Sequence, residues 1–378
     1  MRTTFIRRDN SLIGRWWWTI DRWSLMAVLA LIAVGILMSF AASPPVANRL
    51  NLEAFFFVKR HLVMTIPAVF LIFVVSLLTP IQVRRFATIG FLVCLCLLTL
   101  TLFYGVEIKG AKRWLNLAGN SIQASEFMKP FFAIMTAWMF AEKAKKSNFP
   151  GVLISFFLMT CIVGLLMMQP DLGMTVVIVF TWCVQLFLSG IPFIWIGIVF
   201  GAAIVGLMGA YMFFPHVTKR IDQFLDPVSG DTKQELYQIT QSLEAFMNGG
   251  LFGKGPGEGI VKKHIPDAHA DFVFAVTGEE FGFIVCSIIV LLFLFIIVRS
   301  LLRTMEDSSI FIVLGTCSLA AQFALQTFVN MASTLHLIPT KGMTMPFISY
   351  GGSSQIALGI SMGMLLAFTR ERHGQMEY

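Results

Sequence analysis

The sequence predicts an all-α, polytopic integral membrane protein with about ten transmembrane helices. Residues of the set AVILMFWYC make up 57% of the 378 residues, and only 13% are charged. The mean hydropathy is +0.78. Soluble domains are usually about 45–50% apolar and about 25% charged. The apolar residues also gather into runs close to the ~20 residues that a spanning helix needs. We therefore expect a single membrane domain, residues 1–378.

The N-terminal segment, residues 1–23, is rich in arginine and tryptophan. Cations beside an apolar run are typical of a cytoplasmic segment, and tryptophan is typical of the membrane interface. The alternative is a nucleic-acid-binding arm, since the chain has a formal net charge of +7. The cations flank apolar runs along the whole chain, however, and form no single basic stripe. We therefore expect lipid headgroups, and no nucleic acid, as their partners.

Ten apolar runs predict the spans, at about 24–42, 62–79, 86–104, 126–141, 151–168, 174–189, 193–211, 271–298, 309–331 and 355–368. An even number of spans places both termini on one side of the membrane. Three short basic connections fall on that side, as does the tail 369–378; they contain Arg84 and Arg85, Lys143 to Lys146, and Arg299 to Arg303. The positive-inside rule therefore predicts that both termini are cytoplasmic. The polar segment 212–270, between helices 7 and 8, is then a long periplasmic loop.

The stretch from His264 to Gly282, HIPDAHADFVFAVTGEEFG, places a carboxylate at the edge of an apolar run. Asp271 is the last polar residue before a predicted helix that continues to about residue 298. An ionisable group at such a border is costly and indicates function by default. Glu279 and Glu280 follow deeper in the same run. An ideal helix rotates them away from Asp271, so we expect them to hold the helix against its neighbours.

Two further polar stretches lie on the predicted outer side. In the stretch from Lys109 to Pro130, Glu126 and Lys129 are three residues apart and close enough to pair on one helix face. This pair could have either a structural or a functional role. Ser125 is a candidate N-cap for the helix that carries the pair. In the turn Gln169 to Gly173, Asp171 is expected to cap the helix that follows.

Two glycine-containing stretches break the helical pattern. The run GLFGKGPGEG, within Gly249 to Gly259, has neither the Ser or Thr after Gly-Lys nor the preceding strand that a phosphate-binding loop requires. In Leu337 to Ser354, prolines and glycines interrupt a span around Lys341. Broken backbone at membrane depth is tolerated where it is buried in protein or lines a wet cavity. Lys341 there suits a phosphate or carboxylate partner.

Metal and disulfide chemistry have no clear signal in the sequence. All six cysteines lie inside apolar runs, which predicts small core residues. His264, His269 and His336 lack the spacing of zinc ligands. We therefore predict no metal site formed by these residues.

Five motifs between about residues 110 and 354 resemble those of the SEDS family (shape, elongation, division and sporulation proteins): ASEFMKP, QPDLG, YQITQSLEA, PDAHADFVFAVTGEEFG and PTKGMTMPFISYGGSS. The Pro-Thr-Lys-Gly of the last motif is the form typical of the division member of the family. The departures are small. Ala124 stands where the family usually has Pro, Asp267 where it has Glu, and Ala270 where it has Thr.

This resemblance implies a peptidoglycan glycosyltransferase that polymerises lipid II into β-1,4-linked glycan strands, with undecaprenyl diphosphate as the leaving group. It implies action at the outer face of the cytoplasmic (inner) membrane, during septal cell wall synthesis and cell division. It further implies two kinds of partner: a class B penicillin-binding protein, an FtsI-type transpeptidase, and other divisome proteins.

Glycan polymerisation needs a base near the attacking hydroxyl and positive charge near the pyrophosphate that leaves. Our hypothesis is that Asp271 is the base, as at the matched position of the family. The expected substrate-binding residues are Lys341, Lys129, Glu126, Lys112, Arg113, His269, Ser349, Gln238 and Gln241. A divalent cation, Mg or Mn, could help to neutralise the leaving pyrophosphate, but no cluster of metal-ligating residues requires one.

Two other functions suit the same sequence. Ten spans, broken helices and buried charges are also typical of a transporter, here a lipid II flippase. A purely structural septal scaffold is the third possibility. The flippase binds lipid II without reacting with it, so a polymerisation assay separates it from the enzyme.

Overall fold

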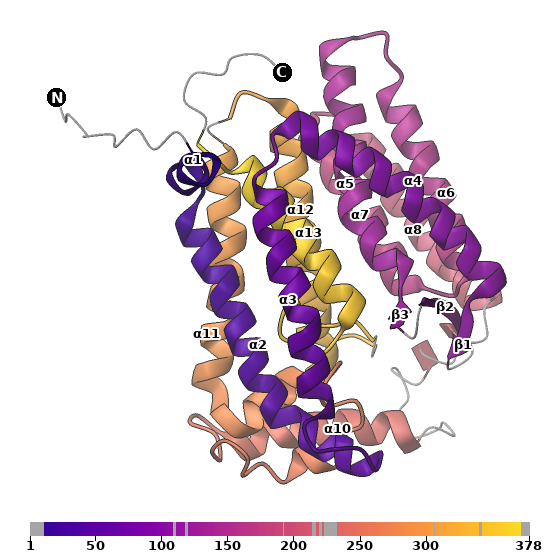
Figure 1. Ribbon diagram of the computed structural model, residues 1–378. Coiled ribbons are helices and arrows are strands. Elements are labelled where there is room, and N and C mark those ends of the chain that lie inside the picture. The colour runs from indigo at the N-terminus through magenta and orange to yellow at the C-terminus, as the bar shows by residue number, and fades with distance from the viewer. Residues whose placement is uncertain are drawn as a thin grey trace.

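The computed structural model describes residues 11–108, 111–117, 120–191, 193–213, 217–218, 221–222, 233–305, 307–339 and 342–371. Each of the ten predicted spans coincides with a helix of one bundle (Figure 1). These helices are α2 (Arg22–Arg49), α3 (Phe56–Ser76), α4 (Pro80–Tyr104), α5 (Ala124–Lys145), α6 (Gly151–Met168), α7 (Leu172–Leu188), α8 (Phe193–Phe213), α11 (Val273–Thr304), α12 (Ile310–Thr334) and α13 (Gly352–Phe368). The predicted all-α membrane fold is confirmed.

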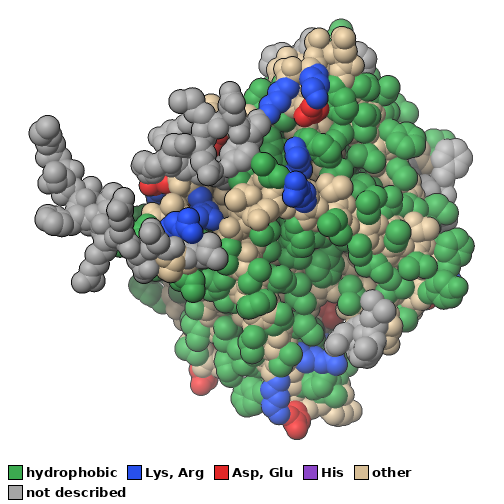
Figure 2. Space-filling model, turned by 45° about the horizontal axis from the view of Figure 1, so that its top comes forward, with side chains coloured by type: hydrophobic (Ala, Val, Ile, Leu, Met, Phe, Trp, Pro, Cys, Tyr) green, Lys and Arg blue, Asp and Glu red, His purple; other side chains and the backbone are tan. Residues whose placement is uncertain are grey.

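The outside of the bundle suits a bilayer. Helices α2, α3, α4, α6, α11 and α12 are each long and apolar enough to cross a membrane, while α7 and α13 are shorter apolar helices. Hydrophobic side chains cover most of the face seen in Figure 2, where charged side chains form only a few small groups. Large exposed side chains such as Ile66, Phe70 and Ile89 contribute to the apolar surface. Soluble monomers rarely expose apolar patches of this extent.

The core of the bundle lies along α5, α12 and α13, whose residues are mostly buried. Helix α13 packs along α3, and α5 contacts both α4 and α12. Phe132, Phe323 and Phe368, one from each core helix, are among the largest fully buried side chains. Helix α5 also carries Glu126 and Lys129, and α12 carries Gln322, Gln326 and Asn330, so this part of the candidate site is built on the best-packed part of the molecule.

Several smaller elements were not predicted. A short helix α1 (Leu12–Thr19) precedes α2. Strands β1 (Val106–Ile108), β2 (Ala111–Leu117) and β3 (Asn120–Ile122) form an antiparallel sheet in the order β1-β2-β3. Within the segment predicted as a long loop, α10 (Lys233–Gly249) lies across one end of the bundle, followed by the 3-10 turn η1 (Val261–Lys263) (Figure 1). The prediction of Ser125 as an N-cap is wrong, because Gln123 is the N-cap of α5.

Helix α11 is broken at Gly282, where the backbone has φ +76° and ψ −175°. The glycine-rich run after α10 pairs with the break. The Lys254 N–H donates to Glu279 O (2.9 Å), and the Phe283 N–H donates to Gly250 O (2.9 Å). A Cβ on Gly282 would lie 2.4 Å from Gly253 N, so only glycine allows this approach. The run is thus a structural loop that satisfies the backbone of a broken helix.

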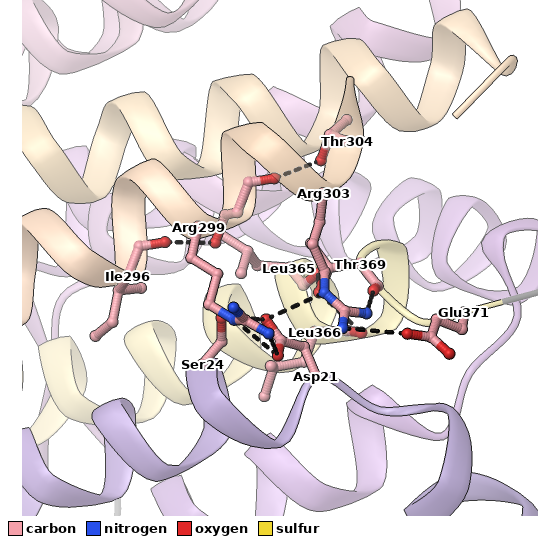
Figure 3. Close-up of polar contacts among 11 residues, drawn as sticks. Asp21, Ser24, Ile296, Arg299, Arg303, Thr304, Leu365, Leu366, Thr369 and Glu371 are labelled. Atoms are coloured by element: carbon pink, nitrogen blue, oxygen red, sulfur yellow. Dashed lines mark hydrogen bonds and ion pairs between the residues drawn. The ribbon is translucent and has the colours of Figure 1, made fainter. Parts of the chain in front are cut away.

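The opposite end of α11 is fixed by an ion cluster around Asp21, the N-cap of α2 (Figure 3). Arg299 donates to both Asp21 carboxylate oxygens at 2.7–2.9 Å, and Arg303 lies 3.6 Å from Oδ2. Arg303 also pairs with Glu371 (3.2 Å) beyond α13. Arg370 donates to the Thr19 hydroxyl, so the described start and end of the chain meet at this end of the bundle.

Candidate functional site

Asp271 lies in the turn immediately before α11, at the end of the bundle away from Asp21. Its N–H donates to Asp267 O (3.1 Å), and Asp267 takes a left-handed conformation, φ +53°. The Asp271 side chain is half-buried, whereas the following Phe272, Val273 and Phe274 are buried. Asp271 is therefore the last polar residue before the apolar helix, as predicted. The N-terminus of a helix favours a negative charge.

Gly342 brings the last sequence motif against this carboxylate. A Cβ on Gly342 would lie 3.2 Å from Asp271 Oδ2, so the backbone at 342 passes directly beside the carboxyl group. Two motifs that are about 70 residues apart in the sequence thus meet at Asp271. Lys341 and Thr340 of the same motif lie outside the described residues. The assignment of Lys341 to substrate binding stays a prediction.

A polar stripe on α12 connects the parts of the site, and sequence reasoning missed it. Gln322, Gln326 and Asn330 are spaced by four residues, which places them on one face of an otherwise apolar helix. All three side chains are buried. They donate to backbone carbonyls of three segments, those of Lys129, Thr344, and both Asp271 and Met343. The signal was the repeated spacing of amides within a membrane span.

Lys129 and Glu126 form the ion pair that their spacing predicted. Lys129 Nζ lies 2.7 Å from Glu126 Oε2, and both side chains are buried. The ammonium also donates to Gln326 Oε1 at 2.7 Å. The pair is therefore held rigidly against the α12 stripe and through it against residues 342–345.

Arg113 and Lys112 occupy different environments although they are neighbours on β2. Arg113 Nε donates to Gln169 O (3.2 Å) and Nη2 donates to Pro170 O. It therefore fastens the sheet to the turn before α7. Lys112 is exposed. In the turn before α7, the Asp171 carboxylate accepts from the Met174 N–H at 3.4 Å, which confirms the predicted helix cap.

His269 is a packed residue beside Asp271. Its ring lies 4.1 Å from the ring of Phe57 and 5.3 Å from that of Tyr350, between centroids. Its carbonyl accepts from the Tyr350 N–H (2.9 Å), which joins the Asp271 loop to the start of α13. Burial lowers the pKa of His269 to about 4, although the charge of Asp267 acts to raise it. The imidazole is therefore neutral near pH 7.

The remaining predicted site residues are placed as follows. Ser349 is buried, and its hydroxyl accepts from the Met345 N–H (2.9 Å), so it closes its own turn within the last motif. Gln241 on α10 donates to Glu244 on the same helix (2.9 Å), and Gln238 is half-buried one turn earlier. Among the described residues, no cluster of three His, Cys, Asp or Glu could hold a metal ion.

Glu279 and Glu280 hold α11 in place, as predicted. Glu279 Oε1 accepts from the N–H groups of Ile260 and Val261, both at 2.8 Å, and Oε2 accepts from that of Lys262 at 2.8 Å. Glu280 forms a buried ion pair with the Lys262 ammonium. Both carboxylates are thus committed to the loop that precedes Asp271.

Comparisons with known proteins give a consistent result. The family model FTSW_RODA_SPOVE, described as cell cycle protein, matches residues 22–374. A Caulobacter vibrioides protein named "Probable peptidoglycan glycosyltransferase FtsW" is 42% identical over 371 residues, which cover 98% of this chain and 94% of that protein. An Escherichia coli O6:H1 protein of the same name is 33% identical, over 93% of this chain and 86% of that protein.

Solved structures have the same fold. One chain, from work on the structural coordination of polymerization and crosslinking by a peptidoglycan synthase complex, matches with a TM-score of 0.76 and 25% identity, covering 93% of this chain and 97% of that one. The Thermus thermophilus rod shape determining protein RodA matches with a TM-score of 0.66 and 24% identity over the same shares. This chain therefore belongs to the SEDS family of cell cycle proteins, the family of FtsW, RodA and SpoVE.

Proposed function

We propose that this chain is a peptidoglycan glycosyltransferase that polymerises lipid II into β-1,4-linked glycan strands in cell division. The names of its FtsW relatives support the activity, and the synthase complex of similar fold supports the reaction class. The observation that carries the proposal is the meeting of two distant motifs at one half-buried carboxylate: the backbone of Gly342 lies against Asp271 Oδ2.

In this mechanism Asp271 is the general base. The 4-hydroxyl of one disaccharide attacks the anomeric carbon of another, and its proton passes to the Asp271 carboxylate. The bond from that carbon to the lipid pyrophosphate breaks, and the pyrophosphate leaves with the bonding electrons. A direct displacement inverts the anomeric carbon and gives a β-linkage. A carboxylate at a partly dry edge suits the role because little water competes for the proton.

Cations stabilise the charge that develops on the pyrophosphate. We assign this role to Lys112, which is exposed on β2, and to Lys341, which precedes Gly342 in the sequence. Lys129 adds positive charge from within the bundle, where Glu126 and Gln326 hold its ammonium group in place. Arg113 contributes by fixing the sheet that carries Lys112.

The same proposal orients the bundle. The Asp21 cluster lies on the cytoplasmic side of the inner membrane, because the short basic connections gather at that end. Asp271 and α10 then face the periplasm at the division septum. The synthase complex that couples polymerization and crosslinking supports a class B penicillin-binding transpeptidase as partner, within a larger set of divisome proteins.

A lipid II flippase is the second candidate. The buried amides of α12 favour this function, as do the non-helical residues 342–351 beside them, because transporters bind polar groups at broken helices. The two functions differ in their product. The enzyme makes glycan strands, whereas the flippase only moves the lipid between leaflets.

The test uses full-length protein in vesicles with lipid II and the partner transpeptidase, and measures both glycan strands and lipid translocation. Asp271→Asn should reduce strand synthesis by about 10²–10⁴-fold, the usual contribution of a general base. Lipid II binding and the unfolding temperature should stay at the wild-type values. Asp267→Asn is the matched control: it removes a carboxylate from the same loop, and Asn tolerates its left-handed backbone.

Two results would contradict the proposal. Normal strand synthesis by Asp271→Asn would show that another group is the base. Translocation without strand synthesis by the wild-type protein would establish the flippase instead.

A further inference from the structure

We propose that Asn330 of α12 is a positioning residue for Asp271. The proposal rests on the proposed role of Asp271 as the base, and it concerns a side chain outside all five sequence motifs. Asn330 is completely buried. Its amide nitrogen donates to the carbonyl oxygen of Asp271 (3.1 Å) and to that of Met343 (2.7 Å). One amide group therefore joins the two segments that meet at the carboxylate.

An asparagine suits this position for a chemical reason. Its NH₂ group has two donors in one plane, so it can satisfy two carbonyls at once. A serine or threonine has one hydroxyl donor, and an ionised aspartate has none. Asn330 Oδ1 has no hydrogen-bond partner in the described part of the chain. Exchanging the amide oxygen and nitrogen would turn this oxygen toward two carbonyl oxygens, so the surroundings fix the orientation of the amide.

The neighbours of Asn330 make the connection rigid. One turn earlier on α12, Gln326 donates to Thr344 O (3.0 Å), and the Thr344 hydroxyl contacts that of Ser354 (2.8 Å). The 342–345 segment is thus attached to α12 at two successive carbonyls. On the other side, the Asp271 loop is held by Asn330 and by the hydrogen bond from the Tyr350 N–H to His269 O.

Removing the Asn330 donors should displace the Asp271 carboxylate without removing any residue that binds the substrate. The Asp271 carbonyl and the 343 carbonyl would lose their shared donor, and each segment could shift independently. A displacement of about 1 Å at a reacting group can cost about 10²-fold in rate. Both the proton transfer to Asp271 and the charge on the pyrophosphate develop in the transition state, so the turnover number should fall while KM for lipid II stays nearly constant.

The experiment compares three variants of the full-length protein, reconstituted with lipid II and the partner transpeptidase. Asn330→Asp has the same shape and replaces the NH₂ donor by an oxygen. Asn330→Ser keeps one donor and adds no charge, and it carries the same comparison if the Asp variant does not fold. Thr327→Val is the matched control, because it removes a buried hydroxyl of α12 that donates only to Phe323 O on its own helix.

We expect kcat to fall at least 30-fold in Asn330→Asp and by an intermediate factor in Asn330→Ser, with KM within threefold of wild type. Thr327→Val should keep wild-type kcat and KM. A kcat within threefold of wild type in both Asn330 variants, or an equal loss in Thr327→Val, would overturn the proposal.

A second readout does not depend on activity. Amide hydrogen exchange at residues 268–275 and 343–349 should be at least tenfold faster in the Asn330 variants than in Thr327→Val. Unchanged exchange would exclude Asn330 as the connection between the two segments, whatever the rates. Faster exchange together with normal polymerisation by Asp271→Asn would keep this connection and exclude Asp271 as the base.

Discussion

The two ends of α11 each meet an aspartate, and the two aspartates differ in how deeply they are buried. At the Arg299 end, Asp21 is fully buried, and both of its carboxylate oxygens accept hydrogen bonds from Arg299. At the other end, Asp271 is half-buried in a turn beside a glycine. A fully buried carboxylate whose two oxygens accept from arginine is closed to a substrate proton, whereas a half-buried carboxylate is accessible to one. Surroundings, and not residue type, separate a structural acid from a candidate catalytic one.

Glu279 extends the comparison because it lies on α11, the helix that follows Asp271, but has the surroundings of a structural acid. It is completely buried and accepts hydrogen bonds from three consecutive backbone N–H groups, in the run from Ile260 to Lys262. If saturation defines a structural role, changing Glu279 should affect stability first. Changing Asp271 should affect rate alone.

The largest stability effect is therefore expected for Glu279→Gln. One carboxylate oxygen becomes an NH₂ group that faces N–H donors, and a buried charge is lost from its partners. We expect a loss of about 3–5 kcal/mol in the free energy of unfolding. The measurement is the unfolding free energy in detergent, with the exposed Glu258→Gln as control. A loss below 1 kcal/mol would contradict the comparison, because a buried acid with all its hydrogen bonds satisfied would then contribute little to the free energy of unfolding.

The Asp21 cluster should show a smaller effect of the same kind. Asp21→Asn removes the carboxylate that Arg299 and Arg303 share, but Arg303 keeps Glu371, and the two arginine side chains are 27% and 26% exposed, so water compensates in part. We expect a loss of about 1–3 kcal/mol in the free energy of unfolding. Glu371→Gln, at a side chain that is 52% exposed, should cost less than about 1 kcal/mol. Equal losses in the two variants would mean that burial of the carboxylate does not set its contribution.

The pH dependence of this contribution has a defined sign. Burial acts to raise the pKa of the Asp21 carboxyl, but the hydrogen bonds from Arg299 and Ser24 and the nearby charges outweigh it and hold the pKa below its usual value. A lowered pKa in the folded state gives stability that is present above the unfolded-state pKa and is lost as pH falls through the folded-state pKa. The Asp21 cluster should therefore remain intact at any pH above about 5.

The sequence predicted the membrane spans and the position of Asp271 more fully than it predicted the contacts between the spans. Apolar run length determines where helices form in a bilayer, so all ten ranges coincide with helices. The Asp271 border and the Glu126–Lys129 pair follow from local spacing. The role of Asn330 and the pairing of the glycine-rich run with the break at Gly282 depend on segments that meet only after folding. Ser125 failed as a cap because the helix begins one residue before it.

The last expected effect concerns His269, a half-buried neutral group next to the candidate base. Its pKa of about 4 in the fold is below the ordinary value of 6.5, so between these values the unfolded chain binds more protons. Stability should then fall as pH is lowered from 6.5 to 4 and stay constant above 6.5. His269→Phe keeps the ring contacts with Phe57 and Tyr350 but cannot be protonated. It should reduce the loss of unfolding free energy between pH 7 and 5 by at most about 2 kcal/mol. His264→Phe, at an exposed position, should leave the wild-type slope. If His269→Phe keeps that slope as well, the imidazole binds its proton as readily in the fold as in the unfolded chain, and the site beside Asp271 is wetter than its packing indicates.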